Sequence, residues 1–138
     1  MKRVFVSVLL VCCFFLCGFS FKLKKEKPII ILSSSPVITQ EAMMSSENIF
    51  PRGERISFKF HFPEGFGDNV LRMTLYKFNE KTHTLGYEIV RSKDIRVVLG
   101  DKTYTDYFVL YQPGIYQVQF VESRKPRRIL AYARFKVR

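Results

Sequence analysis

The sequence contains no tryptophan, and its three cysteines, Cys12, Cys13 and Cys17, all lie in one N-terminal apolar run. The rest of the chain has no thiol, which excludes a disulfide framework, a cysteine nucleophile and a thiolate metal site there. A small domain without disulfides must derive its stability from a packed hydrophobic core.

Residues that carry chemistry are also scarce. The two histidines, His61 and His83, are far apart in the sequence and form no metal-binding motif. Neither a Gly-x-Ser-x-Gly nucleophile elbow nor a glycine-rich phosphate loop is present. We therefore expect a protein that is not an enzyme, with no catalytic residue, no cofactor and no metal.

Asp94, Asp101 and Asp106 come closest to an acidic cluster. Each lies near a predicted turn, where aspartate is favoured because its side chain accepts hydrogen bonds from backbone amides. Structural roles in turns are favoured, and a weak calcium site or acid–base catalysis remains an alternative.

The sequence is rich in bulky apolar residues and in positive charge. Of its 138 residues 47% are hydrophobic, with 14 phenylalanines and 7 tyrosines, which suits one domain with a packed core. The 23 lysines and arginines outnumber 12 acidic residues and give a net charge of +11. This surplus favours an anionic partner or an acidic protein surface.

Residues 1–20 have the pattern of a secretory signal peptide. A basic start, MKR, precedes the apolar run VFVSVLLVCCFFLC, and Gly18 and Ser20 are small residues where a signal peptidase requires them. Cleavage after Ser20 predicts an exported domain in the periplasm or on the cell surface.

Two alternatives for this segment remain open. Acylation of Cys17 or Cys13 would make the protein a lipoprotein, and retention of the run from Val4 to Phe21 would leave a membrane anchor. In either case the chain would associate with a membrane through residues 1–27.

The remaining chain divides into two parts. Residues 21–45 are expected to form a basic tether, KLKKEK, and a first edge segment, PIIILSSSPV. In residues 46–138, apolar and polar residues alternate in stretches that recur roughly every ten residues, with turn signals between them.

The alternation itself identifies strands. In RISFKFHF, the residues Ile56, Phe58 and Phe60 share one face, a period that indicates a half-buried strand and excludes a helix. The stretch YEIVRSKDIRVVL is expected to be one strand, with a break near Ser92 to Asp94 as the alternative. About seven such strands and no long helix predict an all-β, antiparallel β-sandwich.

The segment YQPGIYQVQF places a tyrosine two residues after a Pro-Gly turn, at the head of an alternating strand. It resembles the PGxYxVxV stretch of bacterial immunoglobulin-like and PKD-type modules, and FPRGERISFKF resembles the connection between their strands A and B. The resemblance covers residues 46–138. It implies an immunoglobulin-like sandwich in which Gly114 and Tyr116 form a structural corner, where the tyrosine hydroxyl bonds to backbone. It implies no activity.

Basic residues form the only concentrated feature of the sequence, at the predicted tip of the last hairpin and along the strand that follows. Alternate residues of a strand share one face at intervals of about 7 Å, so the strand charges would form a stripe. Such a stripe attracts anionic partners, but charges on an exposed last strand also prevent edge-to-edge pairing. The candidate basic patch is Arg124, Lys125, Arg127, Arg128, Arg134, Lys136 and Arg138.

Four tyrosines, Tyr104, Tyr107, Tyr111 and Tyr132, cannot all be buried if the strands alternate strictly. Exposed tyrosine together with arginine favours protein contact, although cross-strand pairing explains such residues equally well.

The sequence therefore predicts a non-enzymatic, exported binding or structural module of the cell envelope that mediates protein–protein contact within an assembly. The alternative is an adhesin-like binder of an anionic polymer or lipid surface through the basic hairpin and strand. Nucleic acid is not expected as a partner, because export separates the protein from it.

Overall fold

The computed structural model describes residues 25–35, 46–79, 86–123 and 127–138, so the predicted signal segment lies outside it. The described residues contain eight strands and no helix, and therefore no helix that could cross a membrane. The strands in chain order are β1 (Ile29–Ser33), β2 (Ile49–Phe50), β3 (Arg55–His61), β4 (Val70–Phe78), β5 (Tyr87–Arg96), β6 (Thr103–Val109), β7 (Gly114–Glu122) and β8 (Ile129–Val137).

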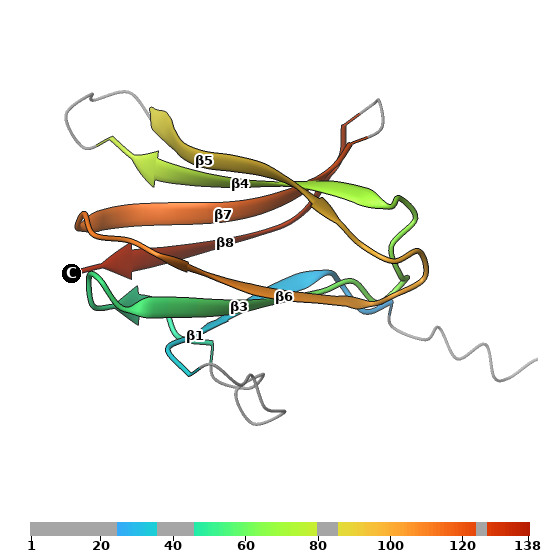
Figure 1. The fold of residues 1–138 in the computed structure, drawn as a ribbon, viewed down its shortest axis with the longest axis horizontal. Coiled ribbons are helices and arrows are strands. Elements are labelled where there is room, and N and C mark those ends of the chain that lie inside the picture. Colours follow the sequence, from blue (N-terminus) through green and yellow to red (C-terminus); the bar gives the residue numbers. More distant parts are fainter. Residues whose placement is uncertain (1–24, 36–45, 80–85, 124–126) are drawn as a thin grey trace, which may run out of the picture.

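The strands form two sheets, which Figure 1 shows with β7 between β4 and β8. One sheet has the order β1-β3-β6 and the other β2-β8-β7-β4-β5. Neighbours are antiparallel except for β2 and β8, which are parallel. The predicted all-β sandwich is confirmed, with a two-residue β2 too short to leave a sequence pattern.

Aromatic side chains from the two sheets form the core. Ile56, Phe58 and Phe60 of β3 are fully buried, as their alternation predicts. Phe60 stacks on Phe120 of β7 with ring centroids 4.4 Å apart. Ser57, on the opposite face of β3, is also buried.

The first edge segment expected within residues 21–45 is an integral strand of the sandwich. β1 pairs along its whole length with β3, and Ile30 and Leu32 belong to the core. The sandwich therefore includes β1, which lies ahead of the boundary predicted at residue 46.

The prediction of one strand is confirmed by β5, and the alternative of a break near Ser92 to Asp94 is wrong. Ser92 pairs in register with Thr74, and the two hydroxyl oxygens lie 3.3 Å apart. The register shifts instead between Leu75 and Tyr76, where Val90 is the extra residue of a β-bulge.

Candidate functional site

The turn before β7 has the geometry that a tyrosine corner implies. Tyr116 is buried, its hydroxyl donates to the carbonyl oxygen of Gln112 at 2.8 Å, and its ring stacks on Phe135 of β8. Gly114 has a φ of +151°, and a Cβ at this position would lie 2.8 Å from Cε of Lys77. Only glycine fits without displacement, so this corner is structural and fixes where β7 begins.

The residues of the predicted basic patch are spread along β8. Arg127 and Arg128 precede the strand, Arg134 lies within it, and Lys136 and Arg138 lie at its end. Because a strand rises about 3.3 Å per residue, the two ends are on the order of 25 Å apart. Outside the described residues lie Arg124 and Lys125.

Two of these cations are engaged by neighbouring side chains. Nη2 of Arg128 lies 3.0 Å from Oε1 of Glu122. Arg134 donates from Nε to Gln117 at 2.9 Å and from Nη2 to the hydroxyl of Tyr87 at 2.8 Å. Within the described ranges, no ion pair is formed by Arg127, Lys136 or Arg138.

Exposed apolar side chains share the solvent-facing side of the five-stranded sheet with these cations. Ile115 of β7 lies opposite Lys136, which in turn lies beside Ile49 of β2. Tyr132 and Ile89 are each 60% exposed. We call this surface the outer face and define it by Ile49, Tyr87, Ile89, Ile115, Tyr132, Arg134 and Lys136.

The expectation that the four tyrosines cannot all be buried is confirmed. Tyr104 is half-buried, and its hydroxyl donates to Oδ2 of Asp106 at 3.1 Å. Burial, with a smaller effect of Asp106, raises the pKa of Tyr104 to about 12. Tyr107 is exposed beneath the guanidinium of Arg55, 4.0 Å from its ring centroid. The most exposed members of the set are Tyr111 and Tyr132.

A hollow of about 630 Å³ lies where β8 ends and β7 begins. Lys136 and Arg138 line it together with Lys77 of β4 and one carboxylate, Glu88. Sequence reasoning missed Lys77, because only the pairing of β4, β7 and β8 brings it beside the C-terminal cations.

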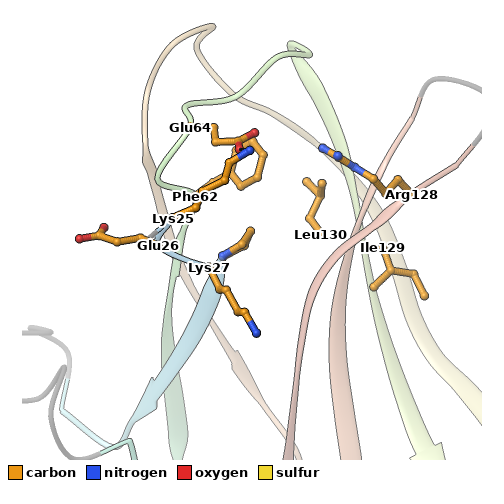
Figure 2. A pocket seen from close by; sticks show the side chains of 9 residues that line it. Lys25, Glu26, Lys27, Phe62, Glu64, Arg128, Ile129 and Leu130 are labelled. Carbon is orange, nitrogen blue, oxygen red and sulfur yellow. Dashed lines mark ion pairs between the residues drawn. The ribbon is translucent and has the colours of Figure 1, made fainter. Parts of the chain in front are cut away.

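A second pocket of about 340 Å³ lies at the other end of β8. Figure 2 shows Lys25, Phe62 and Glu64 on one side of it, with Arg128 and Leu130 on the other. The hydrogen bond and charge of Lys25 lower the pKa of Glu64. No sequence pattern indicated this pocket, because Lys25 belongs to a segment predicted to be a tether.

Potential metal ligands do not converge within the described ranges, where no three His, Cys, Asp or Glu residues form a group. Nε of Arg72 lies 2.8 Å from Asp94 and, by hydrogen bonding, lowers the pKa of that carboxyl. Nε2 of His61 lies 3.9 Å from Oε2 of Glu26, whereas His83 is outside the described residues.

No protein-family model and no curated protein matches the chain. The structure is similar to the soluble domain of PmoD from Methylocystis sp. (strain Rockwell), with a TM-score of 0.51 and 13% identity over 80% of this chain and 90% of that one. Two β-glucosidases, from Kluyveromyces marxianus and Listeria innocua, match at TM-scores of 0.37 and 0.36, with 19% and 11% identity. These matches cover 61% and 80% of this chain but 12% and 16% of the enzymes, too weak a likeness to support an argument. The likeness to the PmoD domain supports a β-sandwich and carries no function.

Proposed function

We propose that this chain is a non-enzymatic binding module of the cell envelope that makes protein–protein contacts within a larger assembly. The observation that carries the proposal is the outer face, where Tyr132, Ile89 and Ile115 are exposed on the same sheet as Arg134 and Lys136. Tyrosine and arginine are enriched in protein interfaces, and neighbouring exposed apolar side chains mark interaction sites. The envelope location rests on the signal pattern of residues 1–20.

Arg134 suits the role of an anchor in such an interface. Its guanidinium is held by Gln117 and by Tyr87, whose ring centroid lies 6.0 Å away. A side chain that is already ordered loses less conformational entropy on binding, so more of its contact energy contributes to affinity.

We assign the sandwich, as part of this proposal, to the bacterial immunoglobulin-like and PKD-type modules. The strand order and the bond from Tyr116 to Gln112 support the assignment. Because such folds carry many unrelated functions, the proposed contact role depends on the outer face.

A pull-down tests the proposal. The tagged chain is incubated with envelope extract of its source organism and washed with rising salt. We expect one defined protein to stay bound at high salt to the wild type and to Lys59→Glu, a control on the other sheet. Ile115→Asp should lose it, because burying a carboxylate in an interface is costly even when a cation such as Lys136 lies opposite it. Equal retention by both variants would contradict the proposal.

A second function, binding of an anionic polymer or lipid surface, is favoured by the hollow at the end of β8. Lys77, Lys136 and Arg138 line it, and Glu88 is the single acidic side chain among its lining residues. Heparin binding should then fall steeply with salt and weaken in Lys77→Gln and Lys136→Gln, because released counterions drive such binding. Salt-insensitive binding would exclude this function.

A further inference from the structure

The outer edge of β8 is hydrogen-bonded to another strand over only part of its length, although β1 of the other sheet also lies near β8. β2 pairs with β8 at two positions, and the N–H of Lys136 donates to the carbonyl oxygen of Asn48 there. Backbone groups of alternate strand residues point to the same side, so the N–H and C=O of Arg134 and Tyr132 also point to this edge. No strand within the described ranges pairs with them.

An apolar groove runs beside this uncovered edge. The pocket of Figure 2 and an adjoining hollow of about 300 Å³ share Lys27, Pro28, Ile129 and Leu130. Ile129 is 56% exposed there. An extended segment that pairs with a sheet edge turns alternate side chains toward one side, where such a groove receives them.

The charges around the groove select the kind of segment. Lys25 is paired with Glu64 and Arg128 with Glu122. Among the residues that line the groove, Lys25, Lys27 and Arg128 exceed Glu26 and Glu64 by one charge. The surplus is positive, so an acidic segment is attracted. A second copy of this chain would bring the same cations against one another, which disfavours self-pairing.

We propose that the edge of β8 at Tyr132 and Arg134 binds an extended, acidic segment of a partner protein as an added strand of the five-stranded sheet. The proposal rests on the proposed function, since it assumes a protein partner, and it specifies how that partner is held. The added strand would adjoin the outer face, because Tyr132 and Arg134 belong to both surfaces.

Amide hydrogen exchange of the free, full chain is the first test. The amides of Tyr132 and Arg134 should exchange rapidly, whereas that of Val118, which lies opposite Ala133 of β8 in the central strand β7, should be protected. Protection of both edge amides in the free protein would show that the edge is already paired, and would overturn the proposal.

A peptide titration is the second test. An isotopically labelled chain is titrated with a synthetic peptide in which valine alternates with aspartate, and separately with its lysine counterpart. We expect the aspartate peptide alone to shift the amide resonances of Tyr132 and Arg134 and to slow their exchange. Equal effects of both peptides, or shifts confined to other strands, would refute strand addition by an acidic segment.

Paired variants separate the backbone contribution from that of the side chain. Tyr132→Ala keeps the edge N–H, whereas Tyr132→Pro removes it without removing a bond to β7. We expect the proline variant to bind the aspartate peptide about fivefold to tenfold more weakly than the alanine variant. Equal binding would contradict the proposal. If the proline variant does not fold, Ile129→Ser is the substitute test, because Ile129 is exposed in the wall of the groove. This variant must bind the aspartate peptide more weakly than the wild type.

The pull-down distinguishes this proposal from the function on which it rests. If Tyr132→Pro and Tyr132→Ala retain the defined partner equally while Ile115→Asp loses it, the outer face binds protein and strand addition is wrong. If neither the wild type nor any variant retains a protein at high salt, the proposed function fails, and strand addition fails with it.

Discussion

Tyr116 shows how one residue links a turn to the core. Its ring packs against Phe135, and its hydroxyl reaches back four residues to the backbone of Gln112. Burial raises the pKa of Tyr116, because the apolar surroundings favour the neutral phenol. The side chain therefore holds the corner in place through both apolar packing and one hydrogen bond.

Replacing Tyr116 by phenylalanine should lower the free energy of unfolding by about 1 kcal/mol, the usual contribution of one such hydrogen bond. Urea denaturation measures the loss. Tyr111→Phe is the matched control, because Tyr111 is 75% exposed and its substitution should leave stability unchanged. The same loss in both variants would show that the corner bond contributes nothing.

Tyr104 should make the protein sensitive to alkaline pH. Its folded-state pKa of about 12 exceeds the ordinary value of 10, so the unfolded chain releases the proton first. This contribution to stability is complete below the unfolded pKa and is lost as pH rises through the folded pKa. Between these values the wild type should lose stability more steeply than Tyr104→Phe in urea titrations. If the free energies of unfolding of the two proteins fell equally with rising pH, Tyr104 would not be the cause of the alkaline sensitivity.

The sequence predicted contacts between residues that lie close together in the chain, and it did not predict contacts between residues far apart in the chain. The corner of Gly114 and Tyr116 lies within a few residues, so turn chemistry and spacing suffice to predict it. The bond from Arg134 to Tyr87 joins residues 47 apart. It depends on the register across four strands, which a single sequence does not contain.

Aromatic pairs between β3 and β7 connect the two sheets at the scale of elements. Phe120 stacks on Phe60 and also lies 5.8 Å from Phe58, centroid to centroid. Phe58 and Phe60 of β3 thus pack against Phe120 of β7 where the two sheets meet.

Phe120→Ala should cost about 3–5 kcal/mol of the free energy of unfolding, because the cavity would lie where both sheets meet. Chemical denaturation gives the value. Gln119→Ala, one position away on the other side of β7, should cost little. A small loss at Phe120 would mean that the sheets are not held together by these aromatic contacts.

Alternation predicted the strands that have one buried face, such as β3, β4 and β7. It could not place β2, whose two residues show no period, or the bulge at Val90. Nearly every residue of β5 is exposed, because β5 is an edge strand that lies beyond most of the core. Its sequence therefore has no alternation of buried and exposed residues from which its continuity could be predicted.

At the scale of the whole molecule, the candidate surfaces meet on β8. Its outward side chains belong to the outer face, its uncovered edge borders the apolar groove, and its last residues line the basic hollow. The net charge of +11, or +9 (21 − 12) after the loss of Lys2 and Arg3 with residues 1–20, attracts acidic partners over a long range and speeds their encounter with the molecule.

Site-specific photo-crosslinking in the source organism tests the role of the outer face most directly. A benzoylphenylalanine replaces either Tyr132 on the outer face or Tyr107 on the opposite sheet, both exposed tyrosines in the free protein. We expect irradiation to join position 132, and not position 107, to one defined protein of the cell envelope. Crosslinks from both positions to many proteins, or from position 107 alone, would show that the outer face is not the binding surface.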